Sequence, residues 1–304
     1  MGGGAGRRGL TGPVGGELDF YATPGPMTDL AGLDEILAGV PTDPAGIASV
    51  VRGLIVHLFW AEAYGVAMPE ERIGDVQVRP AAGIVRTILE IDPRPLVERR
   101  RVEDRFFGNC RHFSTLTTAL LRRAGVPSRA RCGFGGYFQP GRWIDHWIVE
   151  HWDGDRWVRL DPQIDDLQRE ALGLAADPAD LPDGHFLPAG EGWRRCRAGL
   201  EDEDHFGILD MWGREFIEGN IARDLAALNK VEMLPWDGWG VLAREGPPQG
   251  GDRYIDEVAA LTLSGDHGAV RHRYETDDGL RVPPRVMAFA TPAGPVEVDV
   301  PELA

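Results

Sequence analysis

One cysteine, one histidine and one aspartate have the types and spacing that nucleophilic catalysis needs. Cys110 follows Gly108 and Asn109 at the predicted start of a helix, and His146 and Asp161 come later in predicted strands. A thiol at a helix N-terminus lies near unpaired N–H groups, whose partial positive charge favours the nucleophilic thiolate. The same N–H groups can stabilise the oxyanion of a tetrahedral intermediate. Taken alone, Cys110 also fits the role of most free cysteines, a small buried hydrophobic residue.

A turn signal predicts that His146 and Asp161 meet. Asp153 and Gly154 form a dipeptide that commonly closes two-residue β-hairpins. A two-residue turn there places His146 directly opposite Asp161, at a Cβ separation of about 4.5–5.5 Å. The carboxylate would fix the imidazole tautomer and leave the other ring nitrogen free to act on a thiol. A register slip of one residue would turn the two side chains to opposite faces of the sheet.

Other kinds of site fit the sequence less well. Cys110 and His112 are two positions apart on the predicted helix, on nearly opposite sides. His146 and His151 are five apart on a predicted strand and also face opposite ways. The glycines of residues 133–136 open no predicted helix and lack the lysine of a phosphate-binding loop. We therefore expect no metal and no cofactor.

The charge balance narrows the classes of partner. The chain has 304 residues, of which 43% are hydrophobic, and 48 acidic residues outnumber 32 basic ones to give a net charge of −16. This length and composition suit one large domain or two small ones with a buried core. An acidic surface repels phosphate backbones and anionic lipids, so we expect neither a nucleic-acid nor a membrane partner. The sequence leaves the oligomeric state unknown.

Cysteine content and the apolar segments indicate a location. Cys110, Cys132 and Cys196 are too few for a disulfide framework and fit a reducing compartment. Residues 1–16 are rich in glycine and lack the apolar segment of a signal peptide. The longest apolar stretch, residues 47–59, is too short and too charged to span a bilayer. We expect a cytoplasmic protein.

Composition and periodicity divide the chain into three segments. Residues 1–28 predict a flexible N-terminal lead, residues 29–165 a catalytic core, and residues 166–304 a mainly helical extension or cover that packs on this core. Helices are predicted from apolar spacing and cap residues from Asp43 and Pro44 onward and over residues 82–90, 110–124, 205–233 and 252–263. Strands are predicted over residues 129–134, 143–152 and 156–161, and a C-terminal hairpin over residues 286–290 and 296–300.

The candidate catalytic residues lie in motifs that resemble the transglutaminase-like superfamily. Residues 108–113 and the following residues 120–129 resemble the nucleophile helix and next strand of this family. Residues 145–147 resemble its histidine strand, and residues 157–162 resemble its aspartate strand. The resemblance covers about residues 105–165, and its motifs are specific.

This resemblance implies an α+β, papain-like core in which the nucleophile helix packs against an antiparallel sheet that carries the histidine and the aspartate. It implies attack of a thiolate on an amide or ester carbonyl, through a thioester that water or an amine resolves. By residue-by-residue match, Cys110 is the nucleophile, His146 the acid/base and Asp161 the orienting group. The backbone N–H of Cys110 is one expected oxyanion donor, and the matching motifs carry no second donor.

The motifs leave three functions open. The first is an amide hydrolase of protease-like type, acting on a small-molecule or peptide amide. The second is an amide-forming acyltransferase that acts on a small metabolite or a carrier-bound substrate. The third is a binding protein that keeps the fold without catalysis. Protein crosslinking is not implied, because the chain is too short for the extra β-domains of the calcium-dependent animal enzymes and shows no calcium loop.

Four further residues are secondary candidates for substrate binding. His112 follows the nucleophile on its helix, and we expect it to point away from His146 or to dock the helix. Trp143 and Asp145 flank the histidine strand, and Gln163 follows Asp161 by two positions. Each of the four also fits a purely structural role.

Overall fold

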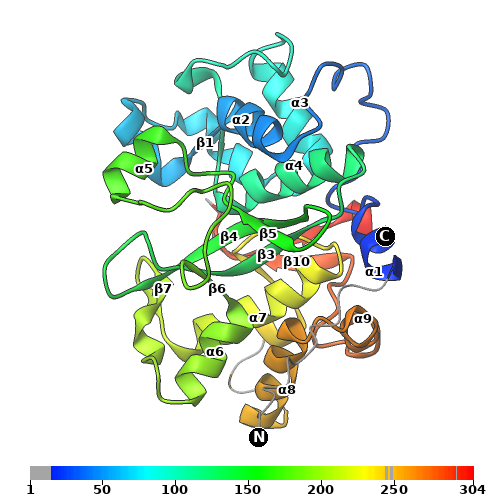
Figure 1. The fold of residues 1–304 in the computed structure, drawn as a ribbon, viewed down its shortest axis with the longest axis vertical. Helices are drawn as coiled ribbons and strands as arrows, with labels where there is room; N and C mark the ends of the chain where they lie inside the picture. Colours follow the sequence, from blue (N-terminus) through cyan, green and yellow to red (C-terminus); the bar gives the residue numbers. More distant parts are fainter. Residues whose placement is uncertain (1–14, 244–245, 247–248, 292) are drawn as a thin grey trace, which may run out of the picture.

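A mixed sheet forms the middle of the molecule (Figure 1). The computed structural model describes residues 15–243, 246, 249–291 and 293–304. Within these residues six strands share this sheet: β3 (Ser128–Gly135), β4 (Trp143–Trp152), β5 (Trp157–Leu160), β6 (Phe186–Pro188), β7 (Phe206–Ile208) and β8 (Met211–Trp212). β4 pairs antiparallel with β3 along one edge. Along its other edge β4 pairs antiparallel with β5 and, nearer its start, parallel with β7.

The elements above the sheet in Figure 1 come mostly from the first half of the chain. They are α2 (Pro44–Leu54), α3 (Ala81–Ile91), α4 (Cys110–Arg123), α5 (Asp166–Leu172) and the short parallel pair β1 (Ile55–His57) and β2 (Phe106–Gly108). Short 3₁₀ turns at residues 58–60, 62–64, 70–77 and 102–104 connect them. Apolar side chains of α2, α3 and α4 form one buried core on this side, and α4 packs against β3 and β4.

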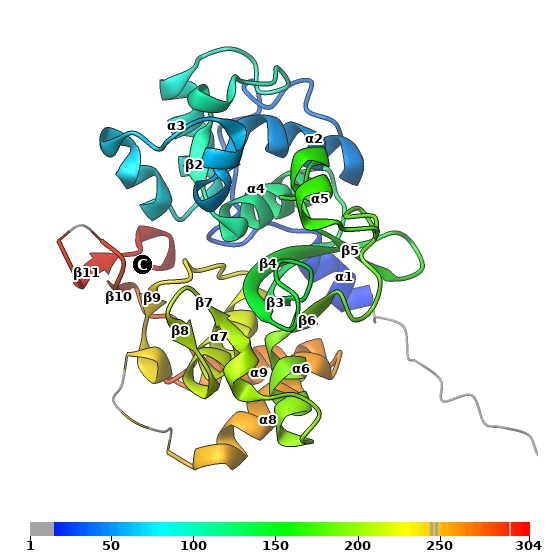
Figure 2. The same cartoon turned by 90° about the vertical axis from the view of Figure 1, so that its left-hand side faces the viewer.

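The elements below the sheet come mostly from the second half of the chain (Figures 1 and 2). They are α6 (Ala189–Arg197), α7 (Arg214–Leu228), α8 (Gly251–Leu263) and α9 (His267–Thr276). A small sheet of β9 (Asp237–Gly238), β10 (Arg285–Ala288) and β11 (Val296–Asp299) lies beside the central sheet (Figure 2). Short 3₁₀ turns lie at residues 203–205, 240–242 and 301–303. A second buried core joins these helices to Phe134 of β3. The second half of the chain also supplies β6, β7 and β8 to the central sheet, so it is built into the fold rather than only laid over it.

The N-terminal lead differs from expectation where the structure describes it. Residues 1–14 lie outside the described residues. After them α1 (Gly15–Tyr21) forms, and the buried Tyr21 hydroxyl donates to the carbonyl of Leu228 at 2.8 Å. Met27 is fully buried in the lower core. Residues 15–28 are therefore anchored, because apolar side chains among the glycines reach a core that the sequence pattern does not reveal.

Most predicted elements are present, and one long helix is shorter than predicted. Asp43 caps α2 with Pro44 in its first turn, and the predicted C-terminal hairpin is β10 and β11. The helix predicted over residues 205–233 begins only at Arg214, because residues 206–212 form β7 and β8 at the edge of the sheet. Among the described residues, the helices are too short or too polar to cross a membrane.

Candidate active site

Cys110 is the first residue of α4, and the preceding residues hold it in place. The Asn109 side chain caps the helix, since its Oδ1 accepts the N–H groups of Arg111 and His112 at 3.1 and 3.3 Å. In return, the Asn109 N–H donates to Nδ1 of His112 at 3.1 Å. Gly108 lies opposite His57 in the β1–β2 pair, so the nucleophile loop is fixed to the upper core. This reciprocal cap satisfies N–H groups that a helix start otherwise leaves open.

His146 and Asp161 form a buried hydrogen-bonded pair. Nε2 of His146 lies 2.8 Å from Oδ2 of Asp161. The Tyr137 hydroxyl also donates to Oδ2 at 2.5 Å, and the Gln163 N–H donates to Oδ1 at 2.9 Å. Burial alone would raise the pKa of Asp161, but the His146 ring and these donors outweigh it and lower the pKa below its ordinary value of 3.8. A carboxylate bound in this way holds Nε2 and leaves Nδ1 of His146 to face a substrate or thiol.

The turn that precedes this pair differs from the predicted one. The observed ladder pairs Val149 with Leu160 and Trp152 with Trp157, so the loop holds four residues rather than two. The Asp153 side chain accepts the N–H groups of Asp155 and Arg156 within it. The register is shifted by two residues from the prediction. A shift of two keeps every side chain on its predicted face, which is why His146 still reaches Asp161 although the two are not opposite neighbours.

The Cys110 thiol is buried, with 6% of its surface exposed. Burial raises its pKa well above the ordinary value of 9.0, and the Asp145 carboxylate raises it further. Hydrogen bonds from the backbone N–H groups of Trp147 and Arg111 oppose this rise without cancelling it. The sequence predicted a stabilised thiolate from the helix start. In the structure the effect of burial outweighs these hydrogen bonds, so the pKa of the thiol is raised rather than lowered.

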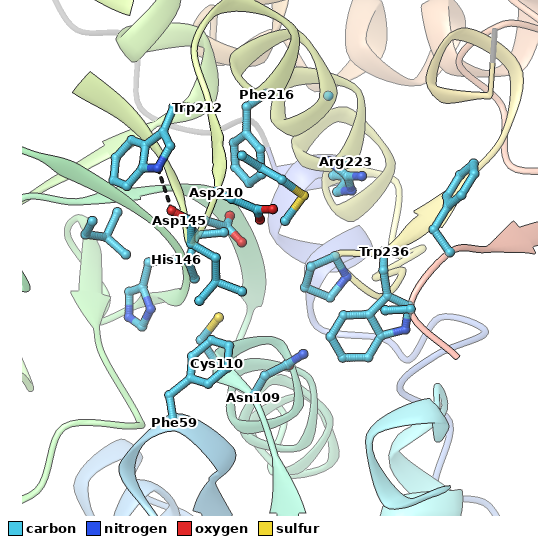
Figure 3. A pocket seen from close by; sticks show the side chains of 18 of the residues that line it. Phe59, Asn109, Cys110, Asp145, His146, Asp210, Trp212, Phe216, Arg223 and Trp236 are labelled. Atoms are coloured by element: carbon cyan, nitrogen blue, oxygen red, sulfur yellow. Dashed lines mark hydrogen bonds between the residues drawn. The ribbon is translucent and has the colours of Figure 1, made fainter. Parts of the chain in front are cut away.

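A cleft of about 1330 Å³ opens beside the thiol (Figure 3). Its apolar walls include Phe59 from the upper half, Trp212 and Phe216 from β8 and α7, and Trp236 before β9. In Figure 3 the Cys110 sulfur lies between the His146 ring and Asn109. The cleft is thus bounded by both halves of the chain, and Cys110 and His146 are among the residues that line it.

A second carboxylate, Asp145, lies in the same cleft and is held from α7. Nδ2 of Asn220 donates to Asp145 Oδ1 at 2.8 Å, and Asn220 Oδ1 accepts from Arg223 at 3.2 Å. Both Asp145 and Asn220 are buried. Burial raises the pKa of Asp145 above its ordinary value of 3.8, against the lowering effect of Asn220 and the nearby Arg223. The thiol therefore has a carboxyl group on the α7 side as well as the His146–Asp161 pair.

The structure separates the four secondary candidates into two pairs. Asp145 and Gln163 line the cleft. His112 is fully buried and docks the helix, as its Nε2 lies 3.1 Å from the carbonyl of Val78. Trp143 stacks on Phe206 with ring centroids 6.0 Å apart. Neither His112 nor Trp143 is among the described residues that line the cleft, so their predicted contact with substrate is corrected to a packing role.

Sequence reasoning did not identify two cleft residues beside the pair. His57 lines the cleft, and burial together with the nearby His146 lowers its pKa to about 3, which keeps its ring neutral. Phe138 packs edge-on against the His146 ring with centroids 4.7 Å apart. The only sequence signal for His57 was that it interrupts an apolar stretch, and for Phe138 that it follows a glycine-rich loop.

One family model matches the part of the chain that contains this site. Residues 78–162, which contain Cys110, His146 and Asp161, match the family model of the transglutaminase-like superfamily. The chain carries the core of this superfamily, as its motifs indicated, and the match indicates a cysteine-dependent enzyme. A search of the curated proteins finds no match.

Among solved structures, the chain is similar to a candidate cysteine protease from Cytophaga hutchinsonii. The two sequences are 16% identical, and the TM-score is 0.33. The alignment covers 49% of this chain and 43% of that protein, so less than half of each is compared.

Proposed function

We propose that the chain is a cysteine-dependent hydrolase that cleaves an amide or ester carbonyl, with Cys110 as nucleophile, His146 as acid/base and Asp161 as orienting group. The observation that carries the proposal is the 2.8 Å contact between Asp161 and His146, because His146 lines the same cleft as Cys110. The substrate class is a small-molecule or peptide amide. The chemistry needs a reduced thiol, which supports the cytoplasm as its location.

The proposed reaction has two stages. In the first, Sγ of Cys110 bonds to the carbonyl carbon while the thiol proton moves to His146, and the C=O electron pair becomes an oxyanion. The oxyanion then collapses, the bond to the leaving amine or alcohol breaks, and His146 returns the proton to that group. In the second, water attacks the thioester and gives a proton to His146. The C–S bond then breaks, His146 passes that proton to the sulfur to restore the thiol, and the carboxylic acid leaves.

The raised pKa of Cys110 decides how the nucleophile would be activated. A thiol that stays protonated at neutral pH needs its proton removed as the substrate is attacked. The proposed base is His146, held through Nε2 by Asp161. The rate at this site should therefore depend strongly on the base. A site with a preformed thiolate would depend on its base less.

An amide-forming acyltransferase is the second candidate. Its support is the surroundings of the thiol, where apolar walls limit water and the carboxyl groups of Asp145 and Asp210 line the same cleft. Acidic groups attract an amine acceptor, which would resolve the thioester in place of water. A non-catalytic binding protein is the third candidate, and it is supported by the burial of Cys110.

The test is acylation of the intact chain by p-nitrophenyl acetate and by short peptide esters, followed by mass spectrometry. We expect one acetyl group on Cys110 in the wild type, none in Cys110→Ala, and much slower acylation in His146→Ala. Cys196→Ser, which removes the half-exposed cysteine on α6, is the matched control and should acylate as the wild type does. Decay of the acyl-enzyme in water, against decay with added glycinamide, distinguishes the hydrolase from the transferase. Equal labelling of Cys110→Ala and the wild type would contradict both enzyme proposals.

A further inference from the structure

The side chain of Asn109 has a defined orientation because of its role as helix cap. Its Oδ1 accepts the N–H groups of Arg111 and His112, and these two donors cannot be satisfied by the NH₂ end of the amide. Oδ1 also lies 2.8 Å from Nδ1 of His112. Rotating the amide by half a turn would set its NH₂ group against both backbone N–H donors, in exchange for that one contact with the ring nitrogen. The NH₂ group must therefore point the other way, away from the helix axis.

The NH₂ group of Asn109 has no partner among the described residues. Asn109 is 5% exposed, and its Nδ2 atom is buried without a hydrogen bond. Leaving a buried donor unsatisfied costs about 1–3 kcal/mol, and a catalytic role is one of the explanations for such a group. Asn109 lines the cleft, and Figure 3 shows its side chain beside Cys110 with the nitrogen at its free end in the cleft.

A second donor lies on the neighbouring residue. Cys110 is the first residue of α4, and the N–H of a first residue has no acceptor within its own helix. Within the described chain, its N–H has no other hydrogen-bond partner, whereas the N–H of Asn109 is taken by His112. The Cys110 N–H and Asn109 Nδ2 thus form two adjacent donors, beside the sulfur that would bond to the carbonyl carbon.

The other donors around the thiol are engaged, lie outside the cleft, or belong to residues distant from Cys110 in the sequence. The Nε2 group of Gln163 donates to Gln168 at 3.1 Å. The Trp147 N–H is directed to the sulfur itself. The indole N–H of Trp147 is unpaired, but Trp147 is not among the described residues that line the cleft. Among the described cleft residues, Arg223 also has an unpaired Nε, but Asn109 is the one that adjoins the nucleophile in the chain.

We propose that Asn109 Nδ2 and the Cys110 N–H together hold the oxyanion of the tetrahedral intermediate. This inference rests on the proposed function and adds a catalytic residue to it. The reacting carbonyl oxygen would lie between the two donors, with the carbonyl carbon against Sγ and the leaving group toward His146. The unsatisfied amide is then a donor prepared for the transition state, at no cost of reorganisation.

The test compares two reactions of the same thiol in Asn109→Ser. Serine caps a helix about as well as asparagine, but it lacks the NH₂ group. Acylation by p-nitrophenyl acetate forms an oxyanion, whereas alkylation by iodoacetamide displaces iodide and forms none. We expect acylation to slow about 10²–10³-fold, the typical loss for one oxyanion donor, with alkylation changed less than about threefold. Melting should be unchanged or higher, since a buried unsatisfied donor is removed.

A second variant, Asn109→Asp, keeps a cap and places a negative charge against the oxyanion. It should acylate more slowly than Asn109→Ser. The assignment of Asn109 is overturned if Asn109→Ser acylates like an active wild type, or if alkylation and acylation fall together. If the wild type itself does not acylate at Cys110, the proposed function fails, and this assignment fails with it. If the wild type acylates and Asn109→Ser acylates equally fast, only the assignment of Asn109 fails.

Discussion

Nε2 of His146 lies 2.8 Å from Oδ2 of Asp161, although the two residues are not paired across the ladder of β4 and β5. Asp161 follows the last residue of β5, and the ladder there pairs Leu160 with Val149. His146 reaches it diagonally, from further along β4 on the same face. The Tyr137 hydroxyl adds a second donor to the same oxygen. The carboxylate is thus held by His146 of β4, by Tyr137 of the loop between β3 and β4, and by the Gln163 N–H that follows β5. Four predictions follow from this site and its surroundings.

Replacing Asp161 with asparagine should lower kcat by about 10³–10⁴-fold, as loss of the orienting carboxylate does in related triads. The amide can donate to Nε2 and so favour the wrong tautomer of His146. Steady-state hydrolysis of a fluorogenic amide measures the loss. Tyr137→Phe is the matched comparison, since it removes one donor and keeps the carboxylate. It should move the acid limb of the pH profile upward, because the hydroxyl helps lower the pKa of Asp161. Equal kcat in Asp161→Asn and the wild type would contradict the orienting role.

Replacing Asp145 with asparagine should make Cys110 more reactive. The Asp145 carboxylate raises the pKa of the thiol, so its removal lowers that pKa and increases the thiolate fraction at a given pH. The rate of alkylation by iodoacetamide at pH 8 should rise about 3–10-fold, which corresponds to a pKa change of up to roughly one unit. Asp210→Asn removes a charge from the same cleft and should change the rate less. A rate unchanged by Asp145→Asn would mean that burial alone sets the pKa of this thiol.

Replacing Glu150 with glutamine should destabilise the fold and flatten its response to acid. Burial would raise the pKa of Glu150, but Arg131, Arg129 and Arg159 lower it well below the ordinary value of 4.5. The stabilisation is therefore complete at neutral pH and is lost as the pH falls below about 4.5 toward the folded-state pKa. Breaking this buried cluster should cost about 3–5 kcal/mol at pH 7.

Thermal melting between pH 7 and pH 3 checks the role of Glu150. The wild-type Tm should fall steeply below about pH 4.5, and the variant should start lower and fall less. Asp153→Asn, at an exposed turn, serves as the control and should leave the profile almost unchanged. Parallel pH profiles for Glu150→Gln and the wild type would show that this carboxylate does not drive acid unfolding.

Replacing Leu209 with glycine should separate stability from substrate binding. Leu209 and Asp210 form the turn between β7 and β8, and the φ of Leu209 is +55°, in the left-handed region that favours glycine. Relief of this strain, of the order of 1 kcal/mol, should keep or raise Tm. Leu209 is 65% exposed on the cleft rim, so its loss should raise KM several-fold for substrates with an apolar group.

Leu200→Ala is a suitable control for this effect on KM. Leu200 is as exposed as Leu209 but is not among the described residues of the cleft, so trimming it should leave KM unchanged. A KM that responds equally to both substitutions would point to a general loss of apolar surface rather than to the rim of the cleft.

The sequence predicted the pairing of His146 with Asp161 correctly, although it predicted the wrong length for the loop between β4 and β5. Asp153 and Gly154 suggested a two-residue loop, whereas Asp153 accepts two N–H groups of a four-residue loop. The register error is an even number of residues, and side chains alternate along a strand with period two. The prediction of the shared face was therefore insensitive to the error in loop length.

The ionisation of Cys110 and the surroundings of the thiol could not be predicted in the same way. The helix start is a local signal, and it favoured a low pKa. Residues far away in the sequence set both the burial of the thiol and the position of Asp145. Asn220 of α7, for example, holds the Asp145 carboxylate. The cap orientation of Asn109 likewise depends on which donors its oxygen meets. These properties arise from tertiary packing, for which one sequence offers no spacing rule.

The cleft combines reacting residues from the first half of the chain with walls from both halves. Cys110, His146 and the wall residue Phe59 precede residue 165, whereas Trp212, Phe216 and Trp236 come from the second half. Because the second half also supplies strands of the central sheet, a fragment ending at residue 165 would lose part of the sheet together with the walls. Substitutions after residue 205 can therefore change which substrates the cleft accepts. The reacting atoms of Cys110 and His146 would stay unchanged.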